Sequence, residues 1–198
     1  IGYQALANED DGTYNTCVGF RAGLNASGSY GSVLLGAQAA GAPTLTGSYN
    51  IVVGMQAGNA LTSAGNSQLI GYQAGYSLTT GDNNIVIGHQ ALDAGTTVNN
   101  SVIIGKDAMG AVPAGQAVEN VTAIGTGALA GSASTTDGIN GTVAIGFSAG
   151  NDLTTGSGNT LVGYMSGDEL LTGDNNTCLG RHTLNNADGD EDDNTCIG

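Results

Sequence analysis

The sequence predicts an all-β protein: a parallel β-solenoid (β-roll) of about eleven 17-residue coils. Three observations predict this fold: a glycine recurs at a near-constant interval, the residues around it form columns of one chemical kind, and the composition suits thin coils. The chain of 198 residues has 35 Gly, no Trp and two Phe, and only 10% of it is charged, against about 25% in ordinary domains. Because 40% of the chain is hydrophobic, a solvated disordered chain is excluded.

The recurring glycine, here called the anchor glycine, always follows an aliphatic residue. The anchor glycines are Gly2, Gly19, Gly36, Gly54, Gly71, Gly88, Gly105, Gly125, Gly146, Gly163, Gly180 and Gly198. By subtraction the intervals are 17, 17, 18, 17, 17, 17, 20, 21, 17, 17 and 18, so two repeats carry insertions. Such internal periodicity is typical of solenoids. We therefore treat residues 1–198 as one repetitive domain, which we expect to be an excerpt of a longer chain.

The three residues before each anchor glycine predict a short strand that ends in a corner, because they are mostly β-branched or aliphatic. We number positions from the anchor glycine, so these are −3, −2 and −1. Side chains alternate between the faces of a strand, and we assign −1 and −3 to the inside of the coil. The core residues assigned at −1 are Val18, Leu35, Val53, Ile70, Ile87, Ile104, Ile124, Ile145, Val162 and Leu179.

Position −2 would then point outward, yet it is apolar in every repeat. An apolar ladder along a whole face indicates a contact surface. We therefore predict inter-chain contacts at Leu34, Val52, Leu69, Val86, Ile103 and Leu161. The alternative is that both faces are buried by a second strand of the same chain.

A second segment contains Leu61, Leu78, Leu153 and Leu170, seven residues after their anchor glycines, and predicts a second short strand. The turn that follows is rich in Gly, Asp and Asn, which tolerate left-handed backbone angles. Asn or Ser then recurs at −4, as in Asn50, Ser67 and Asn84, which predicts a polar ladder bonded from coil to coil.

These repeats resemble a known group of proteins. Residues 84–91 read Asn-Ile-Val-Ile-Gly-His-Gln-Ala, and residues 78–81 read Leu-Thr-Thr-Gly. The pattern is similar to the head repeats of trimeric autotransporter adhesins (YadA-like), and more similar to the repetitive shafts of phage and prophage tail fibres. The resemblance covers the whole chain, although the period is longer than in the adhesin heads. It implies a parallel homotrimer and an elongated rod that presents or spaces a host-binding tip.

Charge narrows the range of partners. The chain has 17 acidic residues against three basic ones, Arg21, Lys106 and Arg181, and a net charge of −14. Nucleic-acid binding requires a basic footprint, and binding to anionic membranes requires Lys and Arg, so neither is expected. No apolar run approaches the about 20 residues of a membrane-spanning helix, so no membrane insertion is expected either.

No catalytic motif is recognisable, and we expect a protein that is not an enzyme. His89 and His182 fall just after anchor glycines and indicate solvated surface positions. Alternating carboxylates at Asp188, Asp190 and Asp192 resemble the start of a calcium loop, so calcium is the one candidate cofactor. Unbound acidic turns are the alternative. Cys178 and Cys196 occupy one column and should stack as neighbours, most simply as free thiols.

The functional prediction is an extracellular fibre shaft, in a viral tail fibre or a surface adhesin. Its partners would be copies of itself, and a host-surface receptor or glycan through flanking domains. One alternative is a self-assembling extracellular matrix filament. Another is a monomeric ligand- or ice-binding solenoid, suggested by Thr79 and Thr80, although their column is interrupted in other repeats.

Overall fold

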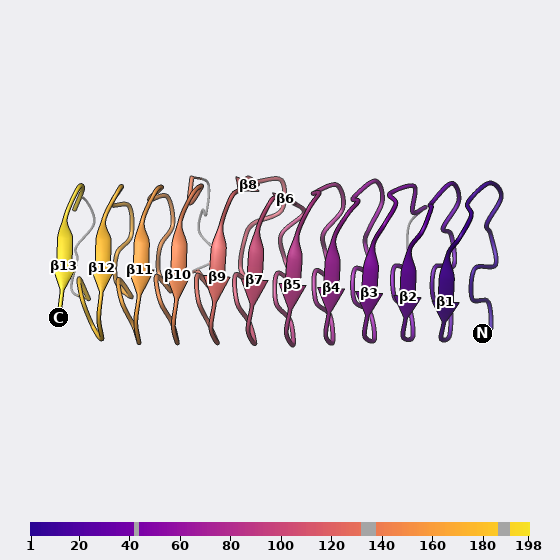
Figure 1. Ribbon diagram of the computed structural model, residues 1–198, viewed down its shortest axis with the longest axis horizontal. Helices are drawn as coiled ribbons and strands as arrows, with labels where there is room; N and C mark the ends of the chain where they lie inside the picture. The colour runs from indigo at the N-terminus through magenta and orange to yellow at the C-terminus, as the bar shows by residue number, and fades with distance from the viewer. Residues whose placement is uncertain (42–43, 132–137, 186–190) are drawn as a thin grey trace.

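The computed structural model describes residues 1–41, 44–131, 138–185 and 191–198, which form a straight rod (Figure 1). Strands lie side by side along it in chain order, and the two termini lie at opposite ends (Figure 1). Eleven strands form one sheet, in which every pairing is parallel. The predicted parallel β-solenoid is confirmed.

Each described strand has three residues and ends one residue before an anchor glycine, apart from two in a small second sheet. The main sheet contains β1 (Thr16–Val18), β2 (Val33–Leu35), β3 (Ile51–Val53), β4 (Gln68–Ile70), β5 (Ile85–Ile87), β7 (Val102–Ile104), β9 (Thr122–Ile124), β10 (Val143–Ile145), β11 (Thr160–Val162), β12 (Thr177–Leu179) and β13 (Thr195–Ile197). The second sheet pairs β6 (Thr97–Asn99) with β8 (Ala117–Glu119). Each strand residue pairs with the residue at the same repeat position in the next strand, so each sequence column becomes a ladder along the rod.

The anchor glycine makes the corner at which each strand ends. Gly88 has φ = +146°, a backbone region that is essentially reserved for glycine. A Cβ atom on Gly88 would also collide with the carbonyl oxygen of Gly105 in the next coil. Conformation and close stacking therefore both explain why this column contains only glycine.

The strand residues alternate as predicted, but the two faces are the reverse of our assignment. The middle residue of each strand points into the coil, and Leu34, Val52, Leu69, Val86, Ile103 and Leu161 are all 0% exposed in a single chain. Their prediction as inter-chain contacts is therefore wrong. The assignment of the −1 column to the coil core is wrong as well, since Val18 is 39% and Leu179 50% exposed. The whole column faces outward: Val18, Leu35, Val53, Ile70, Ile87, Ile104, Ile124, Ile145, Val162 and Leu179 are half-buried or exposed.

The physical reason is the narrowness of the coil, whose interior takes one side chain from each three-residue strand. The composition of the two columns indicates which of them faces outward. The −3 column includes Gln68 and five threonines, whereas the −2 column contains no polar residue other than cysteine. A column that accepts polar residues faces water, and a column that excludes them faces the core.

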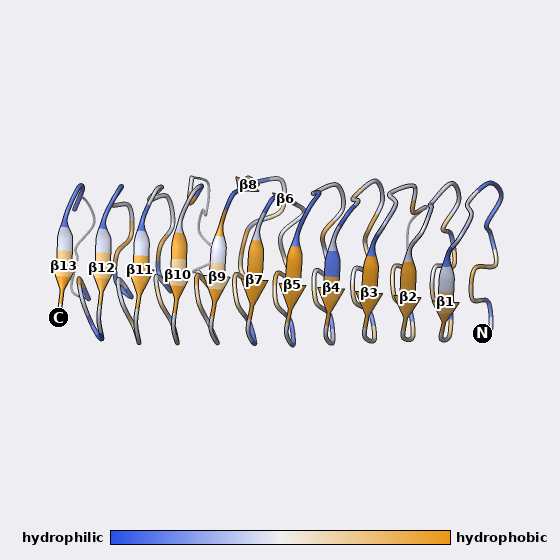
Figure 2. Ribbon diagram, in the orientation of Figure 1, coloured by the Kyte–Doolittle hydropathy of each residue, from blue (hydrophilic) through white to orange (hydrophobic). Residues whose placement is uncertain are grey.

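The rest of the core comes from the return path of each coil. The alanine three residues after the anchor glycine, such as Ala74 and Ala91, is fully buried. Leu61, Leu78, Leu153 and Leu170 also point inward and are at most 1% exposed. None of these four leucines lies in a strand, so the second strand predicted there is not formed, although the segments still bond from coil to coil, as when Thr79 N donates to Thr96 O at 2.9 Å. Figure 2 shows that the strands end in hydrophobic residues, although β4 begins with a hydrophilic one, and that several of the segments leading into them are hydrophilic.

The predicted polar ladder at −4 is confirmed, and its members between the two end coils, such as Asn50, Ser67 and Asn84, are buried. Asn84 N donates to Ser67 Oγ at 3.1 Å, and Ser101 N donates to Asn84 Oδ1 at 3.1 Å. The Asn84 amide also donates across the coil to Val98 O. Asparagine in this column therefore braces two walls of the coil, whereas serine bonds to nearer groups, as Ser67 does to Gly65 O.

Candidate functional surface

The outer face of the main sheet consists of the −3 and −1 columns. Its residues at −3 are Thr16, Val33, Ile51, Gln68, Ile85, Val102, Thr122, Val143, Thr160, Thr177 and Thr195, and at −1 they are the ten reassigned residues above together with Ile197. The two columns contain no charged residue, although the chain carries 20 charged side chains, 17 acidic and three basic. Ile51 is 40% and Ile145 36% exposed in the single chain. The outer face is thus an uncharged, largely aliphatic strip along the rod.

The apolar surface continues past the anchor glycines into the next position, +1. Tyr3, Phe20, Met55, Tyr72, Phe147 and Tyr164 occupy it and are all exposed. Rings in neighbouring coils stack: the centroids of Phe147 and Tyr164 lie 5.2 Å apart. We call the two positions that follow each anchor glycine, +1 and +2, the corner columns. Sequence reasoning missed both, although aligning the repeats on the anchor glycines would have revealed their aromatic and glutamine content.

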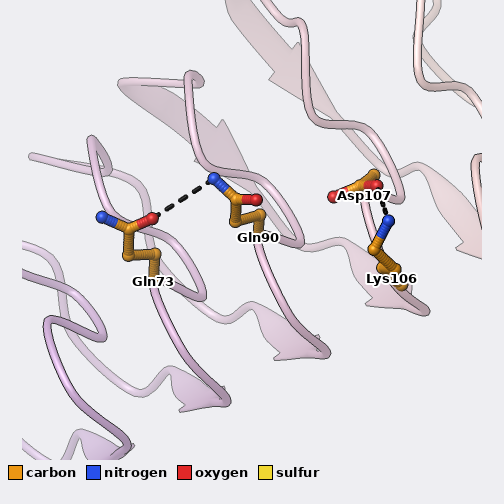
Figure 3. A network of polar contacts seen from close by, with 4 residues as sticks. All are labelled: Gln73, Gln90, Lys106 and Asp107. Carbon is orange, nitrogen blue, oxygen red and sulfur yellow. Dashed lines mark hydrogen bonds and ion pairs between the residues drawn. The ribbon is translucent and has the colours of Figure 1, made fainter.

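The +2 corner column has left-handed backbone in every described coil. Gln73 and Gln90 have φ of +54° and +53°. Their amides form a ladder, in which Gln90 Nε2 donates to Gln73 Oε1 at 3.2 Å (Figure 3). Gln73 Nε2 donates in the same way to Gln56 Oε1 at 3.1 Å. Gln56 in turn donates to Gln38 at 3.3 Å.

All three basic residues of the chain lie in the corner columns. Arg21 lies over the ring of Phe20 at 5.1 Å, and Arg181 lies over Tyr164 at 5.5 Å. Lys106 Nζ lies 2.8 Å from the Asp107 carboxylate (Figure 3), the one ion pair that the structure shows between two described residues. Asp107 is the single acidic residue of the corner columns, whereas the other 16 lie elsewhere in the chain. The corner therefore has the opposite sign of charge from the rest of the rod.

The calcium prediction falls on a turn that the structure describes only in part. Asp188 and Asp190 lie outside the described residues, so the predicted site stays a prediction. The Asp192 carboxylate accepts a hydrogen bond from Asp174 N at 2.7 Å, and Asp82 in the same column accepts one from Gly65 N at 2.6 Å. Within the described ranges, no three His, Cys, Asp or Glu side chains are grouped so that they could hold a metal ion.

The two histidines are exposed, as predicted, and each contacts a tyrosine of the preceding coil. The ring centroids of His89 and Tyr72 lie 5.1 Å apart, and those of His182 and Tyr164 lie 5.4 Å apart. The cysteines are free, and Cys178 stacks on Cys196 in register as predicted. Burial raises the pKa of Cys17 to about 11, and burial with the neighbouring Cys196 raises that of Cys178 to about 12.

Two carboxyl groups near the corner are perturbed by their surroundings. Burial and then the nearby charge of Asp107 raise the pKa of Asp93. Burial, and to a smaller extent the charges of Asp152 and Glu169, raise the pKa of Asp168. The charge of His182 partly offsets this rise. Both carboxylates are therefore less favourable in the folded coil than in water.

Comparison with protein-family models, with curated proteins and with solved structures finds no match to this chain. No described residue belongs to a helix that could cross a membrane.

Proposed function

We propose that the chain is the shaft of an extracellular fibre, assembled laterally from parallel copies of itself as a homotrimer, and that its role is structural rather than enzymatic. Flanking domains would supply the tip that meets a host receptor or glycan, as in a viral tail fibre or a surface adhesin. One observation supports this role above the others: the uncharged aliphatic outer face, which a single chain leaves in water.

The size of this strip fits a stable contact. Eleven strands spaced about 4.8 Å apart give a length of about 50 Å, and the strip together with the adjoining +1 column spans four residue steps, a width of about 13 Å. The resulting area, on the order of 650 Å² per chain, is comparable with the roughly 800 Å² per partner of a standard protein interface. Exposed apolar patches above a few hundred Å² mark interaction sites.

The occupant that fits this strip is another copy of the chain. Its aliphatic rows repeat at the spacing of parallel strands over the whole rod, and a second solenoid presents rows of the same spacing. Because the acidic residues lie outside the strip, copies can meet there without opposing carboxylates. The apolar surface also turns the corner into the aromatic +1 column, which gives each chain surface for more than one neighbour and favours three chains over two.

The test is the solution mass by light scattering on a size-exclusion column. The wild-type chain should have about three times its mass of 19.4 kDa. A double variant, Ile87→Asp with Ile104→Asp, should be folded but monomeric, because it places two carboxylates in the strip. The control is Thr80→Asp, which adds charge at an exposed position away from the strip and should leave the mass unchanged. A wild-type monomer would remove the basis of the proposal.

A monomeric ice-binding role is the second candidate, supported by a specific feature of the outer face. Thr160, Thr177 and Thr195 are exposed in three successive coils, each beside an outward aliphatic residue. Threonines on a flat, regular sheet would present hydroxyls and methyl groups at one spacing. If the wild-type chain is a monomer, measurement of thermal hysteresis with Thr177→Asp as comparison distinguishes this role from an inert rod.

A further inference from the structure

A periodic outer face does not by itself fix how two copies align along the rod. All strands of the main sheet have three residues and pair in parallel register, so the insertions of the longer repeats do not alter the pattern of this face. Moving one copy by a single strand, about 4.8 Å, would again place aliphatic rows against aliphatic rows. A slip of this kind removes contacts only at the ends, so register is weakly specified by the apolar columns.

Lys106 and Asp107 interrupt the repeating pattern of this surface at one coil. Other members of the +1 column are mostly aromatic or small, whereas Lys106 and Arg181 carry a full charge, and the side chain of Lys106 is 61% exposed. Asp107 is the single acid of the corner columns, and its side chain is 44% exposed. An exposed ion pair contributes little to the stability of one chain, so intrachain stability does not explain why this one coil carries both charges at the corner.

We propose that Lys106 and Asp107 fix the register between parallel copies of the chain, by pairing Lys106 of one copy with Asp107 of the next. This inference rests on the proposed lateral assembly. Any rotation axis parallel to the rod keeps equivalent residues at one height, so the two charges of neighbouring copies meet only when the copies are in register. After a slip of one coil, Lys106 would instead face His89 and Gln90, or Thr126 and Gly127, of the neighbour.

The inference also follows a general pattern in symmetric assemblies. A single polar or charged position in an apolar seam sets alignment, because misaligned copies bury a charge without its partner. Arg21 and Arg181 do not serve this role equally, since each lies over an aromatic ring of its own chain and the corner columns place no acid beside them.

The experiment is charge complementation between two variants, Lys106→Asp and Asp107→Lys. Each variant alone places like charges at one height and should weaken association at least about tenfold. Equimolar chains of the two variants, refolded together, should recover part of the wild-type association, because a mixed trimer has two complementary interfaces and one with like charges. Mixed oligomers should exceed the random fraction in native mass spectrometry. Circular dichroism and the melting temperature of each variant at low concentration check that the coil still folds.

The matched control uses Thr80, which contacts Thr97 of β6 at the end of the coil opposite the strand tips (Figure 1). Thr80→Asp and Thr80→Lys should each assemble like the wild-type chain, and their mixture should be random. If the wild-type chain is oligomeric but the Lys106 and Asp107 variants behave like the Thr80 pair, the register proposal is overturned while the shaft proposal stands. A monomeric wild-type chain would overturn both.

Discussion

At the residue scale, the direction in which a strand side chain points decides what a substitution does. Val86 and Ile87 are adjacent, similar in size and both aliphatic, but Val86 is fully buried in the coil and Ile87 lies on the outer face. The sequence predicts their alternation, but it does not state which of them is inside. That depends on the width of the coil interior, which arises from the whole repeat and not from the strand.

We expect Val86→Asp to destabilise a single chain by at least about 4 kcal/mol, because it buries a carboxylate that has no partner. Ile87→Asp should cost a single chain only about 1 kcal/mol, the span of strand propensities at exposed sites. Urea unfolding of dilute protein, followed by circular dichroism, measures both. Equal losses for the two variants would contradict the burial described above.

The anchor glycine gives a second prediction at this scale. Gly88→Ala should destabilise the rod by about 3 kcal/mol or more, because alanine is strained at φ = +146° and its methyl group meets the Gly105 carbonyl. Gly28→Ala is the comparison, since a Cβ there meets no atom within 4 Å although its φ is also positive. Thermal unfolding of the two variants separates the effect of close packing from that of backbone strain.

At the element scale, the coil is held together by ladders. The ladder at −4 could be predicted from the sequence because buried Asn and Ser have few other roles in a repeat of this kind. The corner columns and the bonding of Asp82 to Gly65 could not, because they depend on which backbone N–H groups the left-handed residues leave pointing along the rod. Backbone angles of this sort are not readable from glutamine or aspartate alone.

We expect Asn84→Ala to cost about 2–3 kcal/mol, because it leaves Val98 O and Ser101 N without their side-chain partner in a buried site. Asn84→Ser should cost less, since serine occupies the same column at Ser67 and Ser101 and can still accept from the next coil. Chemical denaturation measures the difference. If the two variants lose stability equally, the acceptor that serine keeps for Ser101 N contributes nothing, and the loss comes from the cross-coil brace to Val98.

At the scale of the whole molecule, charge is unevenly distributed: the outer face of the main sheet has no charged residue, and most charged residues lie elsewhere on the rod. Asp93 and Asp168 have pKa values raised above that of an ordinary carboxyl, so the folded chain binds their protons more tightly than the unfolded chain. Stability should therefore rise as the pH falls from 7 towards about 4, through the raised pKa values. The reduced repulsion within a chain of net charge −14 acts in the same direction.

Melting temperatures across this pH range test the expectation. The double variant Asp93→Asn with Asp168→Asn should be more stable than the wild-type chain at pH 7 and should depend less on pH. A wild-type rod that loses stability steadily from pH 7 downward would show that other carboxylates dominate.

The hydrogen bonds between coils run along the rod, and this has a mechanical consequence. Under tension applied to the two ends, those bonds are loaded directly, while the covalent chain winds around the axis and carries no load until a coil detaches. Each detached 17-residue coil would release roughly 55 Å of slack. A single chain should therefore lengthen in an optical trap in steps of that size, as its coils detach one at a time. In a lateral oligomer, every coil also contacts neighbouring chains. The oligomer should therefore resist extension until coils of several chains detach together.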